Sequence, residues 1–168
     1  MDALIAAEEP KSGVAQLEVL REGPSSMATV LKISDAASLA LHTMVLLADR
    51  RERPLTAKEI ASTFKVSEAH LAKVLQRLAK AGLALSAPGP HGGFHLRNGA
   101  ERTTLLQVYE AIEGPMNSTN CLLGVPVCGG KKCLLGRLVC NLNNQVREYF
   151  SRTRLSDAKA AFQGLGRG

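Results

Sequence analysis

The sequence predicts a mainly α fold: a winged helix-turn-helix with a small β-hairpin wing and a long C-terminal helix. Two helical segments with N-terminal capping signals are separated by a very short turn. A glycine- and proline-rich hairpin signal follows them, and apolar residues recur at helical spacing near the C-terminus. With 168 residues, of which 45% are hydrophobic, the chain can bury a core without disulfides.

The first helix is expected over residues 35–50, where apolar residues recur at helical spacing. Ser34 or Asp35 can cap its first turn, and Pro54 ends the charged connector that follows it. Residues 1–26 are expected to form a flexible extension, because Gly, Pro and Ser punctuate them. They lack the basic segment of a secretory signal peptide, and no apolar run is long enough to span a membrane. We therefore expect a cytoplasmic protein.

The second and third expected helices are separated by a short turn. Thr56 and Glu59 have the spacing of a capping box for a helix that runs to about Phe64. Ser67 then begins a helix over residues 68–81, which Gly82 ends. Its apolar positions follow one helical stripe: Leu71, Val74, Leu75 and Leu78. The opposite face is basic and polar: His70, Lys73, Arg77 and Lys80.

The rest of the chain alternates short elements with a loop and one long helix. Two extended runs, residues 83–87 and 94–97, are joined by a turn-forming stretch and predict a hairpin. A further helix is expected over residues 104–113, and residues 116–132 form an irregular loop. An apolar stripe then predicts a long helix over residues 133–151.

This combination of elements, together with the charge, favours DNA as the partner. The net charge is +6, although residues 1–26 hold five acidic and only two basic residues, so the remainder is more basic than the total. The second helix of a helix-turn-helix enters the major groove, while a wing contacts the backbone or the minor groove. The candidate DNA contacts are Thr56, Ser67, Glu68, His70, Lys73, Arg77, His91, Gly92, Gly93 and Arg97. The alternative is a solvated basic face without a partner.

Four cysteines lie within twenty residues, with the spacing Cys121-x6-Cys128-x4-Cys133-x6-Cys140. The spacing contains no CxxC, so the usual pattern of a structural zinc site is absent. A glycine-containing loop around the first three can wrap an iron–sulfur cluster, but zinc, reactive thiols and plainly buried cysteines all stay open. Cys140 lies about two helical turns beyond Cys133, which favours a packed free cysteine over a ligand.

At this point the sequence resembles the winged-helix iron–sulfur regulators of the IscR and NsrR type. The resemblance covers residues 27–159. The GPxGG(F/Y)xL wing, the EAxEGP motif and the three-cysteine loop occur in that order, which is a specific combination. The matching runs are LKISDAASLALHTMVLL (31–47), LTAKEIASTFKVSEAHLAKVLQRLAKAGL (55–83), GPHGGFHL (89–96), TLLQVYEAIEGP (104–115) and CLLGVPVCGGKKC (121–133).

The resemblance implies a homodimer that pairs through its last helix and binds palindromic, double-stranded promoter DNA. It also implies one cluster per subunit, 2Fe-2S in preference to 4Fe-4S, held by Cys121, Cys128 and Cys133. Asp35 occupies the place of a fourth ligand donated by the partner subunit, with Cys140 in reserve. The competing interpretation of Asp35 is a charge that stabilises the helix N-terminus. The chain departs from the family pattern at Pro88, where an Arg is frequent, and at Ala72, where a Glu is frequent.

The expected domains are an extension (1–26), a winged helix-turn-helix DNA-binding domain (27–115), a cysteine cluster loop (116–133), a dimerisation helix (134–159) and a loose tail (160–168). The expected function is transcriptional regulation controlled by an iron–sulfur cluster that senses nitric oxide, redox state or iron and cluster status. The alternatives are a cluster-free thiol or zinc regulator and a small iron–sulfur electron carrier. An enzyme is not expected, because the chain has no nucleotide-binding glycine motif and no acid–base constellation. No membrane and no small-molecule substrate are expected as partners.

Overall fold

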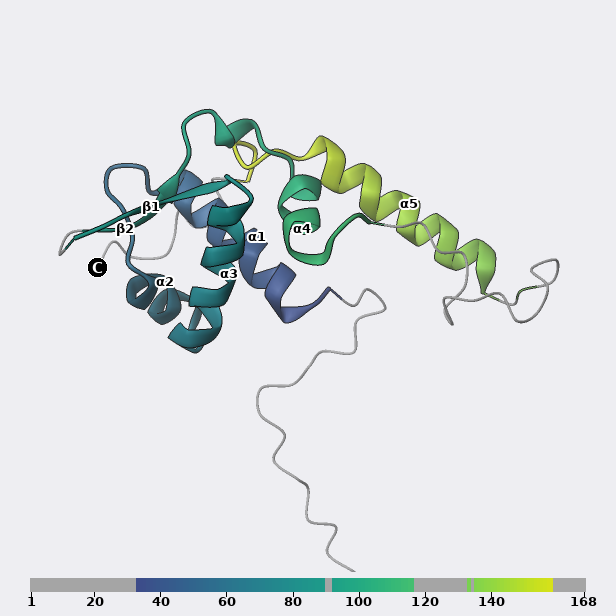
Figure 1. Cartoon of the computed structure of the whole chain (residues 1–168). Coiled ribbons are helices and arrows are strands. Elements are labelled where there is room, and N and C mark those ends of the chain that lie inside the picture. Colours follow the sequence, from purple (N-terminus) through teal and green to yellow (C-terminus); the bar gives the residue numbers. More distant parts are fainter. Residues whose placement is uncertain (1–32, 90–91, 117–132, 134, 159–168) are drawn as a thin grey trace, which may run out of the picture. The chain divides into compact units, whose positions relative to one another are not determined.

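The computed structural model describes residues 33–89, 92–116, 133 and 135–158 (Figure 1). A single antiparallel pair of strands accompanies helices in this region, which confirms the predicted fold class. The elements are α1 (Asp35–Asp49), α2 (Ala57–Phe64), α3 (Glu68–Lys80), β1 (Ala84–Ala87), β2 (Gly93–Leu96), the 3-10 helix η1 (Ala100–Arg102), α4 (Leu105–Glu113) and α5 (Gly136–Arg152). The expected extension 1–26, nearly all of the cysteine loop 116–133 and the tail 160–168 lie outside the described residues.

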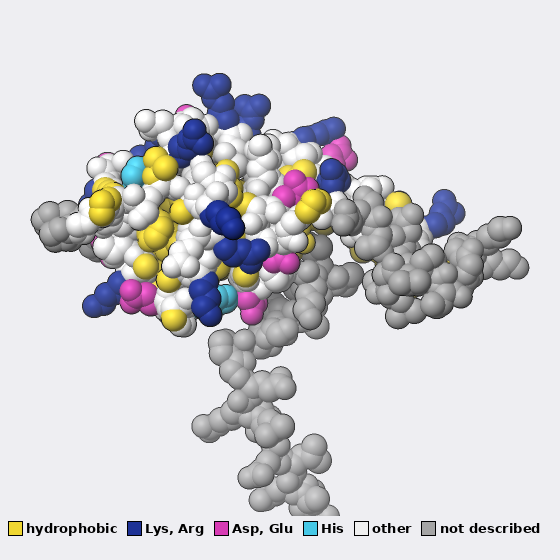
Figure 2. All heavy atoms as spheres, viewed as in Figure 1, with side chains coloured by type: hydrophobic (Ala, Val, Ile, Leu, Met, Phe, Trp, Pro, Cys, Tyr) yellow, Lys and Arg dark blue, Asp and Glu magenta, His cyan; other side chains and the backbone are white. Residues whose placement is uncertain are grey.

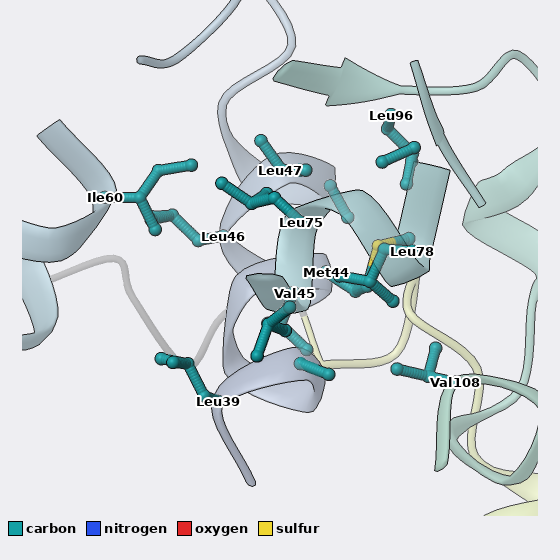
Figure 3. Close-up of a cluster of buried hydrophobic side chains, with 14 of the residues drawn as sticks. Leu39, Met44, Val45, Leu46, Leu47, Ile60, Leu75, Leu78, Leu96 and Val108 are labelled. Atoms are coloured by element: carbon teal, nitrogen blue, oxygen red, sulfur yellow. The ribbon is translucent and has the colours of Figure 1, made fainter. Parts of the chain in front are cut away.

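Helix α1 is the centre of the hydrophobic core. It packs against α3, α4 and β2. Figure 3 shows its side chains meeting those of the neighbouring elements: Met44, Leu46 and Leu47 of α1 with Leu75 and Leu78 of α3, Leu96 of β2 and Val108 of α4. Truncating one such buried leucine to alanine costs about 2–5 kcal/mol. Ser34 is the residue that caps α1, because its Oγ accepts the N–H of Ala37 at 3.1 Å.

The predicted capping box at the start of α2 is present. Thr56 Oγ1 accepts the N–H of Glu59 at 3.2 Å, and the Glu59 carboxylate accepts the N–H of Thr56 at 2.7 Å. Helix α2 packs on α3, and α3 buries the predicted stripe from Leu71 to Leu78. The turn between these helices is therefore fixed by local bonds and by a shared apolar interface.

Both helices of this pair end in the same way. Lys65 after α2 has φ 55°, and Gly82 after α3 has φ 70°. Each left-handed residue lets the next N–H reach back to a carbonyl of the last helical turn, which is the Schellman arrangement. The two closing bonds are 3.0 Å long and run from Val66 to Ala61 and from Leu83 to Leu78.

The wing is a two-stranded hairpin anchored to the connector between α1 and α2. Strand β1 pairs antiparallel with β2, with Ala84 opposite Leu96 and Ala87 opposite Gly93. Leu55 and Phe94 exchange two backbone hydrogen bonds of 2.9 and 2.8 Å, which tie β2 to the start of α2. A Cβ at Gly93 would lie 2.5 Å from the Leu55 carbonyl oxygen, so this close approach requires glycine.

Helix α4 also begins with a capping box, formed by Thr104 and Gln107. The chain returns to this point after α5: Leu105 N–H donates to the Thr153 carbonyl at 2.9 Å, and Leu155 N–H donates to the Thr103 carbonyl at 3.0 Å. The expected dimerisation helix over 134–159 is therefore too long at its end. Helix α5 stops at Arg152, because the backbone beyond it pairs with the segment before α4 instead of continuing the helix.

The start of α5 differs from the prediction as well. The expected helix over 133–151 begins instead at Gly136, after Leu135, which supplies no capping side chain. Helix α5 packs on α4, where the rings of Tyr109 and Phe150 lie 5.9 Å apart. No helix within the described residues has the length and apolarity needed to cross a bilayer.

Candidate nucleic-acid interface and cysteine site

Helix α3 presents one polar face to solvent. Glu68, His70 and Lys73 are exposed, while the apolar stripe on the other side is buried. This division confirms the amphipathic pattern that singled out α3 as a recognition helix. Figure 2 shows Lys and Arg side chains spread over the visible face of the molecule rather than gathered into one patch. The face of α3 is therefore distinguished by its exposure and its place in the helix-turn-helix.

Arg77 is also exposed but has a specific partner within the chain. Its Nη2 donates to the backbone carbonyl of Ile112, in the last turn of α4. Sequence periodicity placed Arg77 on the polar face of α3 and could not reveal this contact, because Ile112 lies 35 residues away. Its expected contact with DNA stays a prediction.

The two residues that begin α2 and α3 differ in how their hydroxyl groups are used. Thr56 Oγ1 donates to Glu59 Oε2 at 2.8 Å and accepts the Glu59 N–H, so the capping box occupies it. Ser67 begins α3 without a side-chain capping bond and is exposed. The Ser67 hydroxyl therefore makes no capping hydrogen bond to the backbone of α3.

An ion pair between Arg53 and Glu59 stabilises the start of α2. Arg53 Nη2 lies 2.6 Å from Glu59 Oε1. This hydrogen bond, followed by those from the Thr56 N–H and hydroxyl, lowers the pKa of Glu59 from 4.5 to about 2. The carboxylate is thus ionised at neutral pH and holds the first turn of the helix that precedes the recognition helix.

The wing contributes one backbone site and one basic side chain to the candidate interface. Gly92 is half-buried, and a Cβ there would lie 2.2 Å from the Ala87 carbonyl oxygen, so the turn requires glycine at this position. Arg97 is exposed, and its Nη1 would be 3.4 Å from a Cβ placed on Gly82. The Arg97 guanidinium therefore lies beside the end of α3. His91 lies outside the described residues.

Two of the four cysteines are within the described residues. Cys133 and Cys140 are half-buried free thiols, and Asn144 Nδ2 lies 3.6 Å from Cys140 Sγ. Cys140 is on α5 and Cys133 precedes it, so the two do not share a helix. Cys121 and Cys128 lie outside the described residues.

Asp35, the expected fourth ligand, is the exposed first residue of α1. Because Ser34 makes the capping bond, the Asp35 carboxylate is not the N-cap acceptor. No group of three His, Cys, Asp or Glu side chains suited to a metal occurs among the residues that the structure describes.

One groove was not anticipated from the sequence. It has a volume of about 440 Å³ and runs between the start of α1 and the α2–α3 turn. Its lining includes the candidate ligand Asp35, the candidate DNA contact His70 and the apolar residues Phe64 and Val66. The apolar residues of such a groove carry no sequence signal, because they come from two separate elements.

Helix α5 leaves two large apolar side chains exposed, and most of its other apolar residues are half-buried. Leu138 is 53% exposed and Tyr149 is 62% exposed, while Phe150 is the buried residue of this helix. Leu135 adds a further exposed apolar side chain at the start of the same helix.

A family model for Rrf2, described as an iron-dependent transcriptional regulator, matches residues 33–161. The chain belongs to the Rrf2 family. A relative in Aquifex aeolicus, named as an HTH-type transcriptional regulator, is 30% identical over 127 residues, which cover 74% of this chain and 88% of the relative. The HTH-type transcriptional regulator IscR of Vibrio campbellii is 24% identical over 128 residues, 76% of each chain.

Solved structures give the same assignment. CymR, the global cysteine regulator of B. subtilis, has a TM-score of 0.65 and 28% identity, covering 78% of this chain and 98% of CymR. T. potens IscR has a TM-score of 0.63 at 21% identity, covering 83% of this chain and 95% of that one, and supports the fold. This Rrf2 chain is accordingly a winged-helix transcriptional regulator and not an enzyme.

Proposed function

We propose that this Rrf2 regulator binds promoter DNA as a homodimer and that an iron–sulfur cluster sets its affinity. The observation that carries the proposal is the exposed polar face of α3, which follows the capped helix α2 and precedes a wing, in a chain of this family. The cluster would be held by Cys121, Cys128, Cys133 and Asp35. The signal that it reports would be nitric oxide, redox state or the supply of iron and clusters.

DNA binding follows from the surface of the helix-turn-helix and the wing. A major groove admits one α-helix, and the exposed side chains of Ser67, Glu68, His70 and Lys73 are those that would meet it. Arg97 and the backbone of Gly92 would contact the sugar–phosphate backbone from the wing. Binding should weaken steeply as salt is raised, because each neutralised phosphate releases a counterion.

The homodimer would form through α5. Its exposed apolar residues need a partner, and a second copy of α5 offers the same stripe in return, as a two-fold interface requires. Dimerisation places two recognition helices on one face. Two half-sites about one helical turn apart, roughly 34–36 Å, would then be read together.

The cluster assignment is supported by the chemistry of the donor set. Three thiols and one carboxylate lie in or beside the two segments that the family resemblance marks, and the half-buried Cys133 thiol immediately precedes α5. Asp35 keeps its carboxylate out of the capping bond of α1. When bound, the cluster supplies a redox-active and nitric-oxide-reactive centre. Residues 117–132 lie between α4 and α5 in the chain, so a cluster bound there would act on how the two helices are held and how the recognition helices are spaced.

Two measurements on the full chain test the proposal. Protein expressed with ample iron and purified anaerobically should contain iron and acid-labile sulfide and absorb in the visible range. Serine substitutions at Cys121, Cys128 and Cys133 should each remove iron, whereas Cys140→Ser should retain it. Asp35→Ala should alter the absorption spectrum or the stability of the cluster.

The outcomes separate the candidate functions. A colourless chain that holds zinc or no metal, but still binds duplex DNA, would identify a cluster-free thiol or zinc regulator. Equal affinity of the apo and cluster-loaded chains for one duplex at fixed salt would show that the cluster is not the switch, because a switch requires unequal binding to two states. A cluster-loaded chain without salt-dependent DNA binding would support the electron carrier.

A further inference from the structure

The end of α4 is a meeting point of four elements. We call residues 112–116 the α4 junction. Side chains from α1, α3 and α5 all make hydrogen bonds to it, and it directly precedes residues 117–132, which contain Cys121 and Cys128. The junction therefore connects the cysteine-containing segment, the long helix and the recognition helix.

The contact from the recognition helix is made by Arg77. Its guanidinium donates to the Ile112 carbonyl, one of the last carbonyls of α4, which have no partner within the helix. A cation at a helix C-terminus is also stabilised by the helix dipole. The contact is thus favourable for both groups, and it holds the Arg77 side chain against α4.

The remaining contacts fix the junction from two further sides. Ser34 Oγ at the start of α1 donates to Glu113 Oε1 at 2.6 Å. Met116 has both its backbone groups bound by side chains: its N–H donates to Glu110 Oε1 at 3.1 Å, and its carbonyl accepts from Arg147 Nη1 at 2.7 Å. Arg147 belongs to α5 and also lies 4.0 Å from the Glu110 carboxylate.

We propose that Arg77 is a positioning residue, which couples the α4 junction to the recognition helix, and that it does not contact DNA. A shift of residues 112–116 moves the Ile112 carbonyl, and Arg77 carries that shift to α3. Arg147 makes α5 part of the same connection through Met116. The inference deepens the proposed function and rests on it, because it assigns the route by which the state of the cysteine segment reaches the DNA-binding surface.

The salt dependence of DNA binding distinguishes a positioning residue from a phosphate contact. The probe is a palindromic duplex that the wild-type chain selects from a random-sequence pool, with a scrambled duplex as reference. Arg77→Gln should lower the affinity for the selected duplex by roughly three- to tenfold and leave the slope of log K against log salt unchanged. Lys73→Gln is the matched control on the same face. It should reduce the slope by about 0.9 for each half-site.

Coupling through the junction is measured by a double-mutant cycle. Arg147→Gln alone should lower the ratio of specific to non-specific affinity, although α5 lies outside the helix-turn-helix. Arg152→Gln is its control, because Arg152 pairs with Glu148 on the same helix and has no bond to the junction among the described residues. In the double variant of Arg77→Gln and Arg147→Gln, the fold-loss of affinity for the selected duplex should be smaller than the product of the two single fold-losses. For Lys73→Gln combined with Arg147→Gln, the fold-loss should equal that product.

Each outcome decides the proposal. A slope that falls for Arg77→Gln as it does for Lys73→Gln would make Arg77 a DNA contact, and simple multiplication of the Arg77 and Arg147 effects would remove the coupling. If Arg77→Gln lowers the melting temperature so far that the chain is unfolded, Arg77→Met repeats the slope test, because it removes the charge and keeps a long unbranched side chain. Arg147→Gln still tests the connection through the junction. A wild-type chain that selects no duplex would instead overturn the proposed function, and sedimentation in the same buffer confirms that the variants keep the wild-type oligomeric state.

Discussion

The N–H of Thr56 donates to the Glu59 carboxylate at 2.7 Å and closes the capping box from which the helix-turn-helix begins. The same carboxylate accepts a hydrogen bond from Arg53 at 2.6 Å. The two bonds bind the connector after α1 to the first turn of α2. They also make the stability of this turn dependent on the ionisation of one side chain.

Acid should therefore destabilise the fold through Glu59. The pKa of this group is lowered from 4.5 to about 2, first by the hydrogen bond from Arg53 and then by those from Thr56. A group with a lowered pKa stabilises the folded state fully above its unfolded value and loses that contribution as pH falls to the folded value. The free energy of unfolding should thus decrease between about pH 4.5 and pH 2, as followed by urea denaturation. Glu59→Gln should flatten this part of the profile, and an unchanged profile would contradict the assignment.

Relieving the left-handed residue between α2 and α3 should stabilise the chain. Lys65 adopts φ 55°, a conformation that costs a residue with a Cβ about 1 kcal/mol more than glycine. Lys65→Gly should raise the free energy of unfolding by up to about 1 kcal/mol, measured by thermal or urea unfolding. Lys73→Gly, at an exposed right-handed position in α3, is the control and should lower it by about 1 kcal/mol. Equal losses at both positions would show that Lys65 makes a compensating contact.

Replacing the hydroxyl of Thr43 should also increase stability. Thr43 is fully buried in α1, and its Oγ1 has no hydrogen-bond partner among the described residues. Thr43→Val keeps the β-branched shape and removes the desolvated hydroxyl, so the free energy of unfolding should rise by about 1 kcal/mol. Thr63→Val is the contrasting variant, because Thr63 Oγ1 donates to the Glu59 carbonyl at 2.9 Å. A loss of stability at Thr43 would indicate a bonded hydroxyl.

A charge at an exposed apolar position near the start of α5 should separate the subunits. Leu138 is 53% exposed, and burying an arginine in the proposed α5 interface would leave a charge without a partner. Leu138→Arg should therefore shift sedimentation from dimer to monomer and weaken operator binding at the same time. Leu85→Arg offers a comparison of equal chemistry on the wing, where Leu85 is 43% exposed, and should leave the sedimentation unchanged. A Leu138→Arg dimer would place the interface elsewhere.

The sequence predicted well those features that depend on neighbours within a few residues. The Thr56–Glu59 capping box spans three positions, so its bonds follow from the residue types and their spacing. The buried and exposed faces of α3 follow from the helical period alone. The wing was predicted within one residue, because glycine and proline confine the turn to a short stretch.

The candidate site could be predicted only in part. Exposure of His70 and Lys73 follows from periodicity, but the partner of Arg77 does not, because Ile112 comes near α3 only after α4 has packed on the core. The groove lined by Asp35 and His70 could not be predicted either, because it forms only when α1 packs beside the α2–α3 pair. The helix expected over 133–151 ends within one residue of the end of α5 at Arg152, but α5 begins three residues later than expected, at Gly136.

Short-range signals in the chain therefore determined the order of the elements, the caps and the amphipathic faces, because local bonds and helical periodicity need no distant partner. The tertiary structure decided which groups from separate elements meet. Arg77, Ser34 and Arg147 converge on residues 112–116 because the core packs α1, α3 and α5 around α4, and the energy of that packing depends on contacts between residues far apart in the sequence.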